Sequence, residues 1–200
     1  MEPVTTWTAA MWSILVPLAY LVGTFPSATL VASANGVDIH RVGSGNPGAS
    51  NVTRVLGWRR GIWVFVLDAA KGALAAGAGM LVAGRPGGYV LGAAAVLGHV
   101  FPVWNRFRGG KGVATGGGII ALLSPLVFTV LVALWFVISR LTRTASLASI
   151  VIVVLLPIGV GIVRREPWEV VATIAVGALV MARHLGNIRR LVTRREHAIT

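Results

Sequence analysis

The feature that most constrains this chain is its series of apolar runs, several of which are long enough to cross a lipid bilayer. A helical span needs about 20 apolar residues. Apolar residues make up 56% of the 200 residues and charged residues only 12%, which is too apolar a composition for an ordinary soluble domain. We therefore predict an all-α, polytopic integral membrane helical bundle, formed by a single domain over residues 1–200.

The positions of the apolar runs predict about seven transmembrane helices. The first covers residues 7–33, with interruptions at Pro17 and at residues 23–26, and the second and third cover 61–83 and 89–103. Residues 112–141 are too long for one crossing, and Ser124-Pro125 predicts a turn between the fourth and fifth spans. The sixth and seventh cover 147–163 and 168–182, with Pro167 at a helix start. The alternative has five spans, with residues 112–123 re-entrant or interfacial.

The distribution of Lys and Arg predicts the orientation in the membrane. With seven spans, fourteen basic residues fall on one side and three on the other, while Lys71 lies inside a span. Because the basic side is normally cytoplasmic, we expect the N-terminus outside and the C-terminus in the cytoplasm. The first residues lack the basic start of a secretory signal, so we expect the first span to be retained. The basic side carries Arg41, Arg54, Arg59, Arg60, Arg106, Arg108, Lys111, Arg140, Arg143, Arg183, Arg189, Arg190, Arg194 and Arg195, and the other side carries Arg85, Arg164 and Arg165.

Charge and composition also exclude several function classes. The net charge of +12 is compatible with nucleic-acid binding, but the basic residues lie at the ends of apolar runs and form no soluble patch with interleaved aromatics, so we expect no nucleic-acid partner. The chain has no cysteine, which rules out disulfides and thiolate metal sites. Its six acidic residues make a carboxylate metal cage improbable. We expect neither a metal ion nor a cofactor.

The segment "GSGNPGASNVTRVLG", residues 43–57, predicts a phosphate-binding loop. Its glycines permit positive φ angles and leave backbone amides free to form a concave anion site. An arginine nearby can bind a phosphate through two parallel hydrogen bonds. The alternative is a glycine-rich cytoplasmic turn with an arginine that sets topology. The candidate ligands are Gly43, Ser44, Gly45, Asn46, Asn51 and Arg54.

The segment "GHVFPVWNRFRGGKGVATGGG", residues 98–118, predicts a second anion site. Lys111 lies between Gly109-Gly110 and Gly112 at the start of a helix, where free amides and the helix dipole favour an anion. The Walker pattern fails because Gly112 follows the lysine, so we do not expect nucleotide hydrolysis. We interpret residues 116–118 as a close helix-packing surface and His99 as a structural residue.

Two further segments carry paired polar residues at helical spacing. Ser146 and Ser149 in "RTASLASI" share one helix face and point into a site, or else cap and contact helices. His184 and Asn187 in "RHLGNIRR" share a face at the end of the last span, where a histidine acts as a base, a phosphate donor or an interfacial residue. Asp68 and Lys71 stand three residues apart inside the second span, so we predict that they form an intramembrane pair that faces the bundle interior.

Together, "GSGNPGASNVTRVLG", "GHVFPVWNRFRGGKGVA" and "RHLGNIRRL" closely resemble the three motifs of the bacterial acyl-phosphate:glycerol-3-phosphate acyltransferases. The resemblance covers nearly the whole chain. It implies transfer of a fatty acyl group from acyl phosphate to the 1-hydroxyl of glycerol 3-phosphate, giving lysophosphatidic acid and phosphate at the cytoplasmic face of a bacterial plasma membrane. It also implies that the site is lined by Ser44, Arg54, Lys111, Ser149, His184 and Asn187.

The positions of these residues in the motifs suggest roles for most of them. Arg54 and Lys111 would neutralise phosphate charge, and the amides of Gly110 and Gly112 would hold the acyl-phosphate headgroup. Ser44 and Asn187 would contact glycerol hydroxyls and phosphate oxygens, while His184 or a substrate phosphate would take the hydroxyl proton. The chain departs from the family at Arg194, where the family tends to have a glycine before a glutamate.

Two other functions fit the sequence less well. A transporter of a phosphorylated solute also has basic pockets between spans, but it commonly shows two related halves, and this sequence has no such repeat. Acyl-CoA-dependent glycerol phosphate acyltransferases use a His-x4-Asp pair. That pair is absent here, because Trp104 and Arg189 stand at the aspartate position after His99 and His184.

Overall fold

The computed structural model describes residues 6–199, so the expectation drawn from the first residues of the chain falls largely outside the described range. Within that range every regular element is helical, as predicted. The helices are α1 (Thr6–Gly23), α2 (Ser27–Ser33), α3 (Ala49–Leu56), α4 (Trp58–Val100), the short 3-10 helix η1 (Val103–Asn105), α5 (Val113–Leu123), α6 (Pro125–Thr142), α7 (Ala145–Arg164) and α8 (Pro167–Val192).

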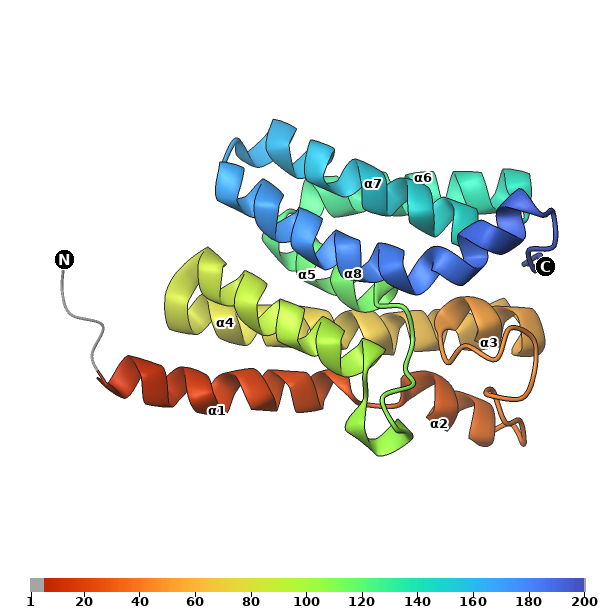
Figure 1. Cartoon of the computed structure of the whole chain (residues 1–200), viewed down its shortest axis with the longest axis horizontal. Helices are drawn as coiled ribbons and strands as arrows, with labels where there is room; N and C mark the ends of the chain where they lie inside the picture. Colours follow the sequence, from red (N-terminus) through yellow and green to blue (C-terminus); the bar gives the residue numbers. More distant parts are fainter. Residues whose placement is uncertain (1–5, 200) are drawn as a thin grey trace.

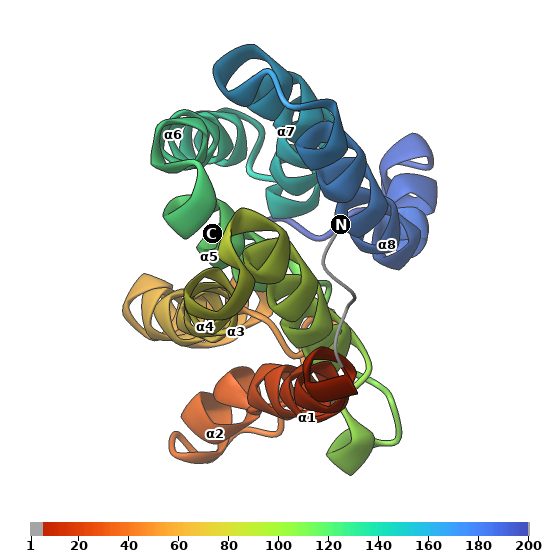
Figure 2. The ribbon, with the colours of Figure 1, turned by 90° about the vertical axis from the view of Figure 1, so that its left-hand side faces the viewer.

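The helices form a bundle in which α4 occupies the centre. Helix α1 packs on one side of α4 and helices α3 and α5 pack against it, while α6, α7 and α8 form a further group (Figures 1 and 2). In the described residues, five helical segments are long and apolar enough to cross a membrane, and one of them, Trp58–Asn105, is twice the usual length. Apolar side chains such as those of Leu74, Leu81 and Ile162 are 68%, 91% and 70% exposed, as expected of surfaces that face lipid.

Helix α4 is two antiparallel arms joined by a tight reversal. Ala83 and Gly84 leave the helical region, and Gly84 has a φ of 60°, which a glycine adopts without a steric penalty. Pro86 then begins the second arm with its ring-fixed φ. Figure 1 shows α4 folding back on itself at this point. The two arms correspond to the spans predicted over residues 61–83 and 89–103.

Other predicted boundaries were partly right. The turn at Ser124-Pro125 is confirmed, because α5 ends at Leu123 and α6 begins at Pro125. The predicted break at Pro17 is wrong, since α1 continues through that residue and the chain leaves the helix only at Thr24. Helix α8 runs on to Val192, past the predicted end at residue 182, because its last turns pack against the site. Helix α5 has 11 residues and a length of about 16 Å, well short of the hydrocarbon core.

The crossing of α4 and α5 depends on glycine. A Cβ atom at Gly72 would lie 1.9 Å from the carbonyl oxygen of Thr115, and one at Gly118 would lie 1.8 Å from that of Ala69. The helix-packing interpretation of residues 116–118 is therefore right for Gly118. It is wrong for Gly116, where an added Cβ would meet no atom within 4 Å.

An ion pair between Arg85 and Glu169 joins three helices at the α4 reversal. Arg85 donates through Nε and an NH2 group to the two oxygens of Glu169, at 2.6 Å each, and through its other NH2 group to the carbonyl of Leu123 at 2.8 Å. Tyr89 donates to the same carboxylate at 3.1 Å. Glu169 is fully buried, so these bonds replace its hydration and fix the start of α8 against α4 and the end of α5.

Candidate active site

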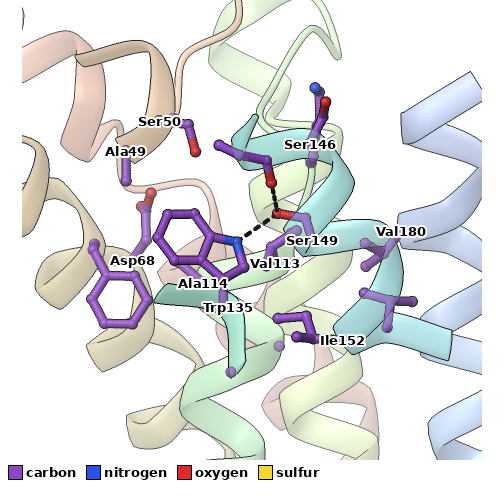
Figure 3. A pocket seen from close by; sticks show the side chains of 18 of the residues that line it. Ala49, Ser50, Asp68, Val113, Ala114, Trp135, Ser146, Ser149, Ile152 and Val180 are labelled. Atoms are coloured by element: carbon purple, nitrogen blue, oxygen red, sulfur yellow. Dashed lines mark hydrogen bonds between the residues drawn. The ribbon is translucent and has the colours of Figure 1, made fainter. Parts of the chain in front are cut away.

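One cavity lies between the α3–α4–α5 side of the bundle and helices α6, α7 and α8. One end is polar and is lined by the loop before α3, the start of α5, the end of α8 and the C-terminal tail. The remainder is apolar, with walls formed by Phe65 of α4, Phe128 and Leu131 of α6, and Ile152 and Leu156 of α7. Figure 3 shows side chains from both parts converging on the same space. A cavity of this kind suits a ligand with an anionic head and an apolar tail.

Asn51 organises the loop of residues 43–54. Its side-chain oxygen accepts from the backbone amide of Ser44 at 2.9 Å and from Arg54 at 3.1 Å, and its amide group donates to the carbonyls of Ile39 and Val42. Gly43 and Gly45 have φ angles of 59° and 68°, so the predicted positive-φ turns are present. Asn51 thus holds the loop shape with all of its polar atoms, while Ser44 and Asn46 face the cavity.

The start of α5 forms the second part of the polar end. Gly112, with a φ of 86°, is the N-cap residue, and no side chain caps the helix. The amide of Gly116 donates to the Gly112 carbonyl at 2.7 Å, so the amides that precede it within α5 have no intrahelical acceptor. Lys111 directly precedes this turn and donates from Nζ to the side-chain oxygen of Asn187. Free amides beside a lysine provide a site for an anion.

Helix α8 places two buried side chains at the polar end, one turn apart. Nδ1 of His184 lies 2.8 Å from the carbonyl oxygen of Val180, which can only accept, so Nδ1 carries a proton. In the neutral ring Nε2 is then an acceptor. Asn187 accepts from Lys111 and donates to Glu196 at 2.8 Å. His184 and Asn187 are 2% and 4% exposed, and both line the cavity.

The C-terminal tail lies across the polar end. Arg54 donates to the carbonyls of Ala198 at 2.8 Å and His197 at 3.3 Å. Glu196 pairs with Arg190 at 2.9 Å and accepts from Asn187. Figure 1 shows the C-terminus and α3 at the same end of the bundle. The tail therefore places the Glu196 carboxylate at the polar end, next to Arg190 and Asn187.

Two serines of α7, Ser146 and Ser149, line the cavity, which is one of the two arrangements that their spacing allows. Ser149 accepts from the indole N–H of Trp135 at 3.0 Å and donates to the carbonyl of Ala145 at 2.9 Å, as drawn in Figure 3. Ser146 is 8% exposed, and its hydroxyl has no partner within the described protein. The Ser146 hydroxyl is thus buried without a partner among the described residues, whereas Ser149 holds the indole of Trp135.

Burial lowers the pKa of the two cations at the polar end, Lys111 and Arg54. Burial lowers the pKa of Lys111 to about 8; Glu196 opposes this shift and the nearby charge of Arg190 adds to it. Burial also lowers the pKa of Arg54, although a guanidinium remains charged at neutral pH. An anion bound beside Lys111 would therefore favour its protonated form.

A buried charge cluster lies behind the start of α5. Lys71 donates to Asp68 at 2.8 Å and to the carbonyl of Phe25 at 2.9 Å, and lies 3.1 Å from Nδ1 of His99. The predicted intramembrane pair of Asp68 and Lys71 is confirmed. The carbonyl of His99 accepts from the Gly110 amide at 3.1 Å, so the cluster is tied to the glycine segment that precedes Lys111.

Comparison with known proteins identifies the family. A family model described as glycerol-3-phosphate acyltransferase matches residues 13–194. This chain belongs to that family. It is 40% identical to the glycerol-3-phosphate acyltransferase of Bacillus velezensis, over 94% of this chain and 97% of that protein. It is 41% identical to that of Aquifex aeolicus, over 92% and 96%.

Two solved structures extend the match to three dimensions. Both are crystal structures of PlsY, described as an integral membrane glycerol 3-phosphate acyltransferase, at 38% identity. The glycerol 3-phosphate form has a TM-score of 0.89 and covers 95% of this chain and 96% of that chain. The lysophosphatidic acid form has a TM-score of 0.86 and covers 95% of both. The fold of this chain is therefore that of an integral membrane glycerol-3-phosphate acyltransferase.

The glycerol-3-phosphate acyltransferase fold brings most of the sequence-predicted site residues together. Of the predicted site residues, those that line the cavity are Ser44, Asn46, Asn51, Arg54, Lys111, Gly112, Ser146, Ser149, His184 and Asn187. Gly43 and Gly45 shape the loop from behind, and Gly109 and Gly110 line a smaller neighbouring cavity. The amide of Gly110, assigned to the acyl-phosphate headgroup, donates to His99 instead, whereas that of Gly112 remains at the helix start.

The structure gives a reason for the glycine that the family resemblance leads us to expect near the end of the chain, in place of Arg194. Arg194 has a φ of 53°, and the amide of Arg195 donates to the carbonyl of Arg190 at 2.8 Å, which is a Schellman turn. Such a turn needs a left-handed residue, and glycine adopts that conformation most readily. The turn directs Glu196 back toward the site. Arg194 therefore holds this turn at some steric cost.

Sequence reasoning missed two residues of the site. Trp135 lies within an unbroken apolar run, so nothing in the pattern separates it from tryptophans that face lipid. Glu196 belongs to no motif, although a lone acidic residue among Arg190, Arg194 and Arg195 is a signal for an internal partner. Its contacts with Asn187 and Arg190 place it in the polar end.

Proposed function

We propose that this protein transfers a fatty acyl group from acyl phosphate to the 1-hydroxyl of glycerol 3-phosphate, giving lysophosphatidic acid and inorganic phosphate. The observation that carries the proposal is the single cavity that joins a polar end rich in cations to an apolar extension. Both proposed substrates carry phosphate, and one carries an acyl chain. The polar end suits the phosphates and the apolar part suits the chain.

The reaction needs orientation and charge stabilisation more than activation, because an acyl phosphate is already a mixed anhydride. The hydroxyl oxygen attacks the acyl carbonyl carbon and forms the ester C–O bond. The C–O bond to phosphate breaks, and phosphate leaves with the electron pair. The hydroxyl proton passes to Nε2 of His184 or to a phosphate oxygen. Preorganised donors stabilise the charge that develops on the carbonyl and the leaving phosphate.

The contacts in the polar end support specific roles. Lys111 and the free amides at the start of α5 receive the phosphate of the donor, since helix starts and lysines bind such anions. Arg54 releases the tail carbonyls to which it donates and then neutralises the second phosphate. Ser44 and Asn187 contact the glycerol hydroxyls and phosphate oxygens. The Ser146 hydroxyl, which has no internal partner, adds a further donor.

We also propose that the chain crosses a bacterial plasma membrane seven times, with the N-terminus outside and the active site and C-terminus facing the cytoplasm. The two arms of α4 supply two crossings, and α1, α5, α6, α7 and α8 supply the others. Fourteen of the 18 Lys and Arg residues then fall on the cytoplasmic side. The short α5 completes its crossing within the protein, where backbone at membrane depth is tolerated.

Turnover with two donors tests the proposed reaction. Purified protein in liposomes is given glycerol 3-phosphate with either palmitoyl phosphate or palmitoyl-CoA, and lysophosphatidic acid is measured by mass spectrometry. We expect product from the acyl phosphate alone. Lys111→Ala abolishes turnover because the leaving phosphate loses its cation, whereas Arg140→Ala, which removes an exposed cation outside the cavity, keeps it. Binding of glycerol 3-phosphate without turnover of either donor would refute the proposal in favour of a transporter.

A further inference from the structure

Two glycines of α5 face the cavity. Gly116 and Gly117 both line it, although neither is needed for helix packing. A Cβ atom at Gly116 would meet nothing within 4 Å, and one at Gly117 would meet only the ring of Phe128, at 3.6 Å. By contrast, a Cβ at the next residue, Gly118, would collide with the backbone of α4. The space beside Gly116 and Gly117 is therefore part of the cavity.

These glycines lie where the polar end of the cavity gives way to the apolar part. Gly116 follows the N-cap residue Gly112 by one turn, so it lies about 6 Å further along the α5 axis. Beyond it, Ile120 lines the same cavity. Opposite α5 stand apolar side chains of α6 and α7, including Leu131 and Ile152. An acyl phosphate held by its phosphate at the start of α5 must extend past Gly116 for its acyl chain to reach this apolar part.

We propose that Gly116 and Gly117 are the specificity-determining residues for the acyl chain of the donor. Because these two residues have no side chains, the cavity beside them is wide enough for the first carbons of a long acyl chain to pass. This inference rests on the proposed function and deepens it by assigning the acyl path to one face of α5. A larger side chain at position 116 narrows that path and favours short chains, while the phosphate and glycerol contacts remain unchanged.

The substitution Gly116→Leu tests this path without disturbing the fold. The open space accepts the new side chain, and replacement of glycine within a helix removes its entropic cost, so we expect thermal stability to be equal or higher. Gly77→Leu is the matched control. Gly77 is also a helical glycine with room for a Cβ, whose nearest neighbour would be Leu122 at 3.6 Å, but it does not line the cavity.

The measurement is kcat/KM for a series of butyryl, octanoyl, dodecanoyl and palmitoyl phosphate, with glycerol 3-phosphate saturating. In Gly116→Leu we expect the ratio of kcat/KM for palmitoyl to that for the shortest donor used by the wild type to fall at least about tenfold. The KM for glycerol 3-phosphate and the Gly77→Leu profile stay at wild-type values. The same ratio for Gly116→Ala lies between those of the wild type and Gly116→Leu, because alanine is smaller than leucine.

Two results would overturn the inference. An unchanged chain-length profile in Gly116→Leu would place the acyl chain elsewhere, and an equal loss with every donor would mean that position 116 faces the phosphate. Failure of the proposed function is distinct, because it appears in the wild type as an absence of turnover with any acyl phosphate.

Discussion

At the scale of single residues, Lys111 links the activity to pH. Its pKa, lowered by burial to about 8, means that the free site carries this charge below pH 8 and loses it above. We expect kcat/KM with acyl phosphate to decline as pH rises through about 8, since kcat/KM reports the free enzyme. Lys111→Arg, if active, keeps its charge and removes this decline. An identical pH profile in both proteins would contradict the assignment.

His184 supplies a second residue-scale prediction. Its Nδ1 is occupied by the carbonyl of Val180, which leaves Nε2 toward the ligand. If Nε2 takes the hydroxyl proton, His184→Ala lowers kcat by about a hundredfold to ten-thousandfold. Single-turnover rates of formation of lysophosphatidic acid measure this directly. A near-normal rate would exclude His184 as the base and assign the proton to a substrate phosphate oxygen.

At the scale of elements, the end of α8 is held in a strained turn. Arg194 occupies the left-handed position of the Schellman turn, which costs a non-glycine residue about 1 kcal/mol. Arg194→Gly should therefore raise the thermal unfolding midpoint in detergent by about 2–4 °C. Arg195→Gly is the control, because Arg195 is not left-handed and gains only flexibility. A lower midpoint for Arg194→Gly would show that the arginine side chain stabilises the tail by more than the strain.

The helix boundaries show how much of the fold can be predicted from a single sequence. Long apolar runs and the Ser124-Pro125 turn predicted most helix boundaries, because membrane helices are specified by length and composition. The end of α8 at Val192 escaped prediction because its last turns are polar and are held by contacts within the site. Likewise Gly116 and Gly118 look alike in sequence, and only the approach of α4 distinguishes packing from open space.

At the scale of the whole molecule, the site combines residues that are remote in sequence. The motifs identified its donors because glycine, arginine, lysine and histidine stand out in an apolar chain. The contact between Arg54 and the tail carbonyls of residues 197–198 had no such signal, because it joins backbone atoms of a segment without a motif. The apolar walls were equally hidden, since every span presents similar side chains to lipid and to the cavity.

The orientation of the molecule yields a prediction that its lack of cysteine makes clean. In the seven-span arrangement Arg165, in the turn between α7 and α8, is outside, and Arg143, between α6 and α7, is cytoplasmic. Arg165→Cys should react with a membrane-impermeant maleimide added to intact cells, and Arg143→Cys should react only after permeabilisation. The reverse pattern would contradict the proposed seven-span arrangement with the N-terminus outside.

The proposed function of the whole molecule is one reaction at one site. The most direct measurement is the stoichiometry of inorganic phosphate and lysophosphatidic acid formed from palmitoyl phosphate by the liposome-bound wild-type protein, with and without glycerol 3-phosphate. Above the spontaneous hydrolysis measured without protein, we predict equal amounts of both products in its presence and neither product in its absence, because the protein transfers the acyl group only to the glycerol hydroxyl. Protein-dependent phosphate release without glycerol 3-phosphate, or in excess of lysophosphatidic acid, would contradict direct acyl transfer.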